Sequence, residues 1–169
     1  MAFWVNEVRK VADMVRMARE VRRLYSPVHG IVSSLCELNI GEERGCEGFA
    51  VSVRSFARMY YRLIPATEVA SPADGAVTAA GGDRFRLRTG DGLELEVVLP
   101  CSAEYLLQTG DMASAGEPVC RVPCEELCRE KAVVRVQFAD SSRMTELHVL
   151  AGLKRAGSPA AEYSPRRVI

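Results

Sequence analysis

The side chains that most often carry chemistry are sparse in this chain. Only two of its 169 residues are histidines, His29 and His148, and six are cysteines. Imidazole is the group best suited to proton and phosphoryl transfer near neutral pH. Cys120, Cys124 and Cys128 have C-x3-C-x3-C spacing, which on a helix would place two thiolates on one face as zinc ligands. Structural zinc sites usually use C-x2-C pairs with a fourth ligand, so we expect ordinary thiols, with no metal or other cofactor.

The composition favours a cytoplasmic protein that does not bind nucleic acid. Its 22 Lys and Arg residues balance its 22 Asp and Glu residues, so no strong field would attract nucleic acid. No apolar run approaches the roughly 20 residues that a membrane-spanning helix needs. Charged residues interrupt the start of the chain, unlike the apolar core of a secretory signal, and cysteines without such a signal are typical of reduced thiols.

Residues 1–24 are predicted to form an amphipathic helix that precedes the main domain. Within residues 3–24 the apolar side chains of Trp4, Val8, Val11 and Val15 follow helical spacing. We expect this apolar stripe to pack on its own domain or across a homo-oligomer. Six basic residues in the same segment leave open a second interpretation, in which the helix lies on an anionic membrane surface.

Residues 25–151 have the pattern of a compact β domain. Gly and Pro separate short segments rich in Val, Leu and Phe, and "RFRLRTGDGLEL" reads as a hairpin whose first strand has one face in water. The pattern predicts a mainly β fold, an antiparallel sandwich or barrel with short peripheral helices at 56–64 and 124–131. Residues 152–169 are small, basic and interrupted by proline, and we predict a flexible tail.

One phrase occurs twice, 45 residues apart. "SPVHGIVSSL" begins at Ser26 and "SPADGAVTAA" at Ser71. Proline fixes its own φ and glycine tolerates a tight turn, so the phrase suits the entrance to a strand. The two copies predict two similar β units, packed face to face, with Ser26 and Ser71 at equivalent entrances. A third phrase, "TGDMASAGEPVCRV", adds another turn followed by a strand at residues 109–122.

Five phrases together resemble the glucose-type enzyme IIA domain of the bacterial phosphoenolpyruvate-dependent sugar phosphotransferase system. They are "YSPVHGIVSSL", "GCEGFAVSV", "EVASPADGAV", "DGLELEVVLP" and "TGDMASAGEPVCRV", in that order, and the resemblance covers residues 25–128. It implies an antiparallel β-sandwich of duplicated halves. The repeated Ser-Pro phrase would then mark the entrance to each half.

The resemblance also implies a phosphoryl-transfer site of two histidines, and both positions differ here. The family's first histidine, two residues before Phe85, falls on Asp83, and the phosphoacceptor falls on Val98. Pro100 begins the stretch that replaces the family's Gly-Ile-Asp. What the resemblance leaves is a shallow surface for docking a partner, at Asp83, Phe85, Val98 and Pro100, without catalytic groups.

We therefore interpret the chain as an enzyme IIA-like protein that binds or regulates a protein partner in bacterial carbohydrate uptake, without transferring a phosphoryl group. The family implies components of the phosphotransferase system as partners. Two alternatives remain open. The chain could be an active phosphocarrier that uses Asp83 or His29, or a structural or assembly protein on the same fold.

Overall fold

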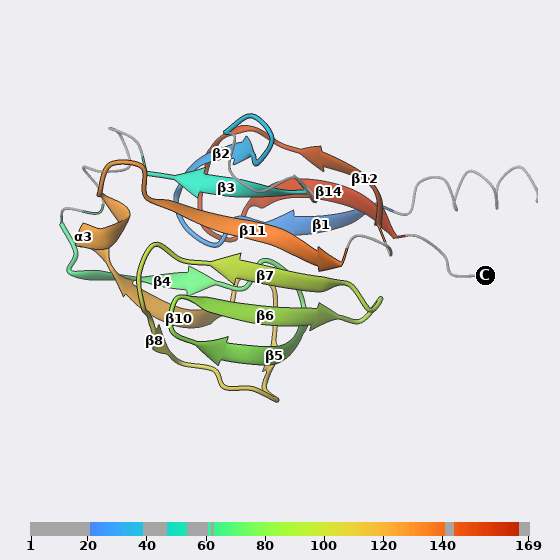
Figure 1. Ribbon diagram of the computed structural model, residues 1–169, viewed down its shortest axis with the longest axis horizontal. Helices are drawn as coiled ribbons and strands as arrows, with labels where there is room; N and C mark the ends of the chain where they lie inside the picture. Colours follow the sequence, from blue (N-terminus) through green and yellow to red (C-terminus); the bar gives the residue numbers. More distant parts are fainter. Residues whose placement is uncertain (1–20, 39–46, 54–60, 62, 141–143, 166–169) are drawn as a thin grey trace, which may run out of the picture.

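The computed structural model describes residues 21–38, 47–53, 61, 63–140 and 144–165, and in these the fold is almost entirely antiparallel β-sheet (Figure 1). This confirms the predicted fold class. The helix predicted for residues 3–24 lies outside the described residues as far as position 20. Most of the predicted helix at 56–64 also lies outside them.

The elements fall into two sets that repeat one plan. The first half contains β1 (Arg22–Tyr25), β2 (Gly30–Ser34), β3 (Gly48–Ser52), β11 (Val133–Asp140), β12 (Met144–Val149), β13 (Gly152–Lys154) and β14 (Pro159–Pro165). The second half contains β4 (Ala66–Ala70), β5 (Gly75–Gly81), β6 (Arg84–Thr89), β7 (Glu94–Val98), β8 (Glu104–Tyr105), β9 (Met112–Ala113) and β10 (Pro118–Pro123), and the one-turn helix α3 (Cys124–Leu127) leads back to the first half. The second half is thus inserted between β3 and β11 of the first.

The two halves share one large sheet. Its strand order is β13-β2-β3-β11-β7-β6-β5-β9, so equivalent strands follow in the same order from either edge. Two three-stranded sheets, β1-β14-β12 and β4-β10-β8, complete the halves. In Figure 1 β11 and β7 lie side by side where the halves meet. The halves are therefore joined edge to edge through β11 and β7, rather than only packed face to face as the repeat suggested.

The repeated phrase occupies equivalent positions, as predicted. Ser26 and Ser71 are both fully buried, and each hydroxyl donates to the carbonyl two residues on, Val28 or Ala73, at 2.7 Å. The two phrases also bond to each other, because the Tyr25 N–H donates to the Pro72 carbonyl at 2.8 Å and the Ala70 N–H to the Pro27 carbonyl at 2.9 Å. The phrases therefore tie the halves together.

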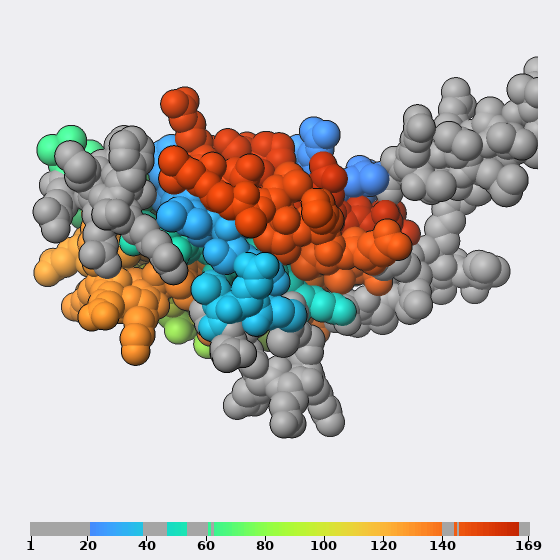
Figure 2. Space-filling view, turned by 90° about the horizontal axis from the view of Figure 1, so that it is seen from above, coloured from blue at the N-terminus to red at the C-terminus, as the bar shows by residue number. Residues whose placement is uncertain are grey.

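The C-terminal segment corrects the prediction of a flexible tail at residues 152–169. β14 is the central strand of its sheet, paired with β1 on one side and β12 on the other, and β13 extends the large sheet beside β2. Ala160 and Ala161 are fully buried. Figure 2 shows these strands, orange to red, lying across the body of the molecule. Small residues are typical of a flexible linker, but here they let a strand approach its neighbours closely.

Two helix boundaries are also corrected. Residues 22–24 were predicted to end a helix, but they begin β1, where pairing with β14 and burial of Leu24 outweigh the helical spacing. The helix predicted at 124–131 ends at Leu127. After it, Lys131 adopts a φ of 66°, which turns the chain into β11. The predicted hairpin between β6 and β7 is confirmed by its antiparallel register and by the Gly92 φ of 82°.

Candidate functional site

The two positions that the resemblance singles out lie side by side at one end of the β6–β7 hairpin. Val98 closes β7 directly opposite Arg84, the first residue of β6. The backbone confirms the proximity, because the Leu99 N–H donates to the carbonyl of Asp83 at 2.7 Å. The structure therefore brings Asp83 and Val98 together.

The residues expected to form a docking surface differ in their exposure. The Asp83 side chain is 48% exposed and accepts a hydrogen bond from Arg84 Nε at 3.2 Å. Val98 is only 6% exposed, and Pro100 is partly buried. Phe85 is fully buried in the core, because alternation along β6 directs it inward between exposed arginines. Phe85 cannot belong to a docking surface, and that part of the expectation is wrong.

Tyr105 on β8 holds the turn that presents Asp83, a role that sequence reasoning did not find. Its hydroxyl lies 2.8 Å from the Arg84 carbonyl and 3.1 Å from the Gly82 carbonyl, so its single proton can serve either. Its ring packs edge-on against Phe85, with ring centroids 6.5 Å apart. Burial raises the pKa of Tyr105 to about 12, so the hydroxyl stays a donor at neutral pH.

A network of charges covers the outward face of the sheet next to Val98. Glu96 is 4% exposed, yet it accepts hydrogen bonds from Arg86 Nε at 2.8 Å, Arg84 Nη1 at 3.3 Å and Gln137 Nε2 at 3.1 Å. Three donors on one carboxylate offset the cost of burying its charge. One position further along the same pair of strands, Arg88 Nη2 binds Glu94 Oε1 at 2.6 Å.

We call these six residues the charged ladder. Its members come from three adjacent strands: Arg84, Arg86 and Arg88 on β6, Glu94 and Glu96 on β7, and Gln137 on β11. The signal was present in the sequence, because "RFRLRT" and "LELEV" alternate with opposite charges on the two sides of a tight turn. Antiparallel register then sets Arg86 opposite Glu96 and Arg88 opposite Glu94, while Arg84, opposite Val98, reaches diagonally to Glu96.

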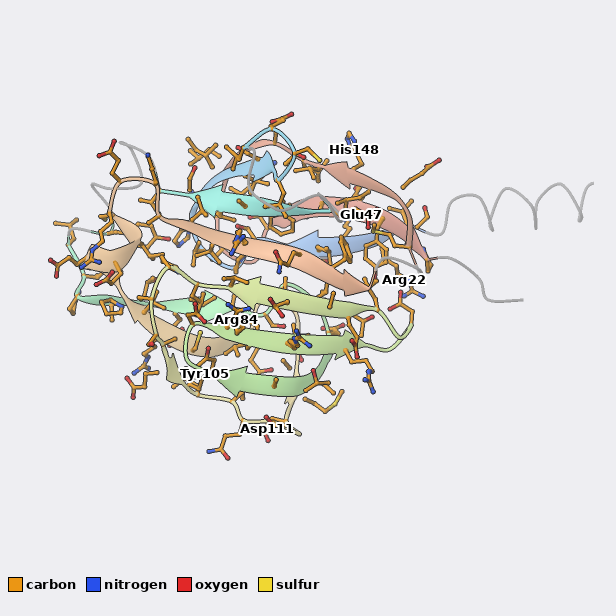
Figure 3. All side chains as sticks on the ribbon, in the orientation of Figure 1. Arg22, Glu47, Arg84, Tyr105, Asp111 and His148 are labelled. Atoms are coloured by element: carbon orange, nitrogen blue, oxygen red, sulfur yellow. The ribbon has the colours of Figure 1, made fainter. Side chains whose placement is uncertain are left out.

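The two histidines lie elsewhere and in separate surroundings. The Nδ1 atom of His29 accepts a hydrogen bond from the Ala156 N–H at 3.2 Å, and burial, followed by the nearby Arg155, lowers its pKa. A neutral imidazole in this turn serves as a backbone cap. His148 is exposed on β12, and Figure 3 shows it in the upper half of the molecule, far from Arg84 in the lower half.

The three cysteines with C-x3-C-x3-C spacing are thiols in or near the core. Cys120 and Cys124 are buried and Cys128 is partly buried, with no disulfide among them. Burial, and next the neighbouring Cys101, raises the pKa of Cys120 to about 12, and burial also raises the pKa of Cys124. Within the described residues, no group of three or more His, Cys, Asp and Glu side chains could hold a metal ion. In the same part of the chain, no helix has the length and apolar character to cross a membrane.

Comparison with known proteins yields a structural likeness and no match in sequence. Glucose permease IIA from Mycoplasma capricolum superimposes with a TM-score of 0.66 over 85% of this chain and 96% of that chain, at 17% sequence identity. No protein-family profile matches the chain. No curated protein matches it by sequence. Identity this low speaks for the architecture and not for the chemistry. The chain therefore has the fold of the glucose-type enzyme IIA domain.

Proposed function

We propose that this chain is a docking module that binds a protein of a bacterial sugar phosphotransferase system and transfers no phosphoryl group through the two family positions. One observation carries the proposal. Val98, with a hydrocarbon side chain, stands at the phosphoacceptor position, and the adjoining surface is a fixed network of charges. Neither valine nor a salt-bridged arginine can serve as a nucleophile.

The charged ladder has the properties of a preorganised docking surface. The side chains of its three arginines are 50% to 58% exposed, while the Glu96 side chain behind them is 6% exposed. Glu96 and Glu94 hold the guanidinium groups in place, so a partner meets donors that have already lost part of their conformational freedom. Arginine is enriched in protein interfaces and binds carboxylates in a bidentate manner, which favours a partner with an acidic patch.

The proposed cellular location and partners rest on the sequence features described above. We place the protein in the cytoplasm, with residues 3–24 available to pack against a second copy or to rest on an anionic membrane surface. The family implies that the partner is the phosphocarrier protein or the sugar permease of the system. Docking without transfer would let the chain compete with an active enzyme IIA domain for such a partner.

A relay assay tests the absence of transfer. The chain is incubated with phosphoenolpyruvate, enzyme I and the phosphocarrier protein, and its intact mass is measured under conditions that preserve acyl phosphates and phosphohistidine. We expect no added phosphoryl group. A phosphorylated species that disappears in Asp83→Ala or His29→Ala would establish the active-carrier alternative instead.

A binding assay tests the docking surface. Affinity for the phosphocarrier protein and for the permease is measured by titration calorimetry, for the wild type and for Arg86→Gln. We expect a loss of at least about tenfold, or 1.4 kcal/mol, when the ladder loses this donor. Arg121→Gln is the matched control, because Arg121 is a salt-bridged arginine of similar exposure on β10, in another sheet. Equal losses in both variants, or no binding by the wild type, would refute the proposal.

A further inference from the structure

An open pocket has Val98 in its wall. Its volume is about 440 Å³, and its walls come from the end of β7 with residues 99–100, the start of β11, and the segment that follows α3. In Figure 1 the end of β7 and the start of β11 meet near α3 at one end of the molecule. The volume lies in the range of small-molecule sites.

The wall of this pocket carries an arginine, Arg135, that has no side-chain partner among the described residues. Arg135 sits at the start of β11, and its neighbours across the sheet are Ala50 on β3 and Val98 on β7, neither of which is charged. In the part of the chain that the structure describes, the Arg135 side chain forms no ion pair or hydrogen bond. By contrast, the arginines of the charged ladder are each paired with a carboxylate. Arg135 is therefore a half-buried cation with its donors unused.

Two further cations line the same pocket. Arg129 pairs with Glu126 at 2.9 Å, which neutralises both. Lys131, like Arg135, has no side-chain partner among the described residues, and Glu130, also in the lining, is exposed. Three cations against two carboxylates leave the lining net positive. Within the described residues, Arg135 and Lys131 are the lining cations whose side-chain donors have no acceptor.

The backbone at Lys131 is unusual for a lysine. Its φ of 66° is in the left-handed region, which residues other than Gly, Asn and Asp rarely adopt. A turn bond from the Ala132 N–H to the Arg129 carbonyl at 3.1 Å closes the same loop. A glycine would adopt this conformation with less strain. A lysine therefore stands at a position that local backbone preference disfavours. Strain of this kind concentrates at binding sites.

We propose that this pocket binds a small phosphate ester. The planar guanidinium of Arg135 can donate two parallel hydrogen bonds to phosphate oxygens, and the ammonium of Lys131 adds a point charge. Val98, Leu99 and Pro100 form an apolar wall on which the organic part of the ester would lie. The proposal is for binding of the intact ester, without a covalent step.

Anion binding at this pocket does not depend on docking of a protein at the charged ladder. None of the six ladder residues lines the pocket, and the two sites meet at Val98, which belongs to the pocket wall and lies opposite Arg84. An anion held here would change the charge and shape of the surface where the two sites meet. The pocket could thus report a phosphorylated metabolite to whatever binds the adjoining surface.

Titration calorimetry with phenyl phosphate, inorganic phosphate and phenol tests the proposal on the full-length chain. We expect saturable binding of phenyl phosphate, weaker binding of inorganic phosphate and none of phenol. Arg135→Gln and Lys131→Gly should each weaken phenyl phosphate at least about tenfold, a change of 1.4 kcal/mol. Arg121→Gln, the same charge change at a distant site, should leave the affinity unchanged, and so should Arg86→Gln in the charged ladder.

The outcomes decide the proposal separately from the proposed function. No saturable binding of either anion, or equal affinity in the wild type and both lining variants, overturns it, as does binding of phenol as tight as that of phenyl phosphate. If Arg135→Gln fails to fold, Lys131→Gly decides alone, because glycine suits the local backbone. Loss of protein docking in Arg86→Gln with intact anion binding would support both sites independently.

Discussion

The outward faces of β6 and β3 occupy equivalent places in the two halves but carry opposite kinds of side chain. Phe85 on β6 pairs with Val97, and Phe49 on β3 pairs with Val136, and both phenyl rings are fully buried. The neighbouring outward positions on β6 are Arg84, Arg86 and Arg88. The equivalent positions on β3 are Gly48, Ala50 and Ser52, of which the first two are buried. The inward residues are thus repeated, while the three arginines of β6 have no charged counterparts on β3.

The turns of the two Ser-Pro phrases, before β2 and β5, also share a hydrogen-bond arrangement while differing in side-chain type. His29 in the first half accepts a hydrogen bond from the Ala156 N–H, and Asp74 in the second half accepts one from the Ala115 N–H at 2.7 Å. One side chain is an imidazole and the other a carboxylate, but both accept a hydrogen bond from a backbone N–H.

Each half has a surface ion pair between equivalent strands, and the strand that carries the arginine in one half carries the glutamate in the other. Arg23 on β1 pairs with Glu162 on β14 at 3.5 Å, whereas Glu68 on the equivalent β4 pairs with Arg121 on β10 at 3.4 Å. The fold needs an acceptor at the turn and opposite charges across the strands. It does not specify which residue supplies them, so chemistry can diverge on one half while the architecture of both stays the same.

The largest expected effect comes from the glycine that follows each Ser-Pro phrase. A Cβ at Gly30 would lie 2.7 Å from the Ser52 carbonyl oxygen, and one at Gly75 would lie 2.6 Å from the Arg88 carbonyl oxygen. We expect Gly30→Ala and Gly75→Ala each to lower the free energy of unfolding by about 3 kcal/mol, measured by urea denaturation. Gly81→Ala is the control, since nothing lies within 4 Å of its Cβ position. A large loss in only one half would break the equivalence.

The second effect should separate the halves. Glu96→Gln removes a buried charge that three donors share, and we expect a loss of about 2 kcal/mol of unfolding free energy. The matched change is Arg135→Gln, at the equivalent outward position on β11, where no side-chain partner is lost among the described residues. Its unfolding free energy should stay within about 0.5 kcal/mol of the wild type. Similar losses in both variants would contradict the view that only the second half relies on ion pairing at this face.

The buried serines offer a symmetric test of intermediate size. Ser26→Ala and Ser71→Ala each remove one hydrogen bond from a fully buried hydroxyl to a carbonyl. We expect each to cost about 1 kcal/mol in unfolding free energy, with the two values close to each other. Ser102→Ala, at an exposed position, serves as the control. If the two losses of unfolding free energy differ by more than about 1 kcal/mol, only one of the two phrases would depend on its serine hydrogen bond for stability.

The smallest effect depends on pH and concerns His29. Burial, with Arg155 as the second cause, lowers its pKa in the folded protein below the usual 6.5. Below about pH 6.5 the unfolded chain binds a proton at His29 that the folded protein does not yet bind. The stability is therefore full above about pH 6.5 and is lost as the pH falls from there through the lower pKa of the folded state.

His29→Asp tests this interpretation by copying Asp74 into the first half. Aspartate keeps an acceptor for the Ala156 N–H and stays ionised through this pH range. The decline in melting temperature between about pH 7 and pH 5.5 should become smaller in the variant. An unchanged decline would mean that other groups cause the pH dependence of the wild type.

Much of the fold could be predicted because local pattern and tertiary structure agree there. Strict alternation in "RFRLRT" predicted β6 with its charges outward, the Gly-Asp-Gly turn predicted the hairpin, and the repeated Ser-Pro phrase predicted the duplication. The C-terminal strands were missed although "AGSP" at 156–159 repeats "AGEP" at 115–118. Gly157 and Gly116 have φ values of 82° and 85°, and their N–H groups donate to the carbonyls of Ser26 and Ser71.

The candidate site was predicted only in part. The sequence placed Asp83 and Val98 in one site by resemblance, and the structure brings them together. It could not show that Phe85 points inward, that Tyr105 holds the turn before β6, or that Arg135 faces Val98 across the sheet. Each of these depends on residues far apart in the chain.

The sequence by itself determined the β6–β7 hairpin and the two strands that follow the Ser-Pro phrases, with their tight turns, and that imidazole is absent from both family positions. These properties follow from alternation, from the φ preferences of Pro and Gly, and from residue identity, all of which act over a few neighbouring residues. Only the tertiary structure decided which strands pair. The register of β11 with β3 and β7 leaves Arg135 between Ala50 and Val98, while the register of β6 with β7 sets Arg86 and Arg88 opposite glutamates. Register is set by burial and hydrogen bonding across the whole sheet, and no local stretch of sequence contains that information.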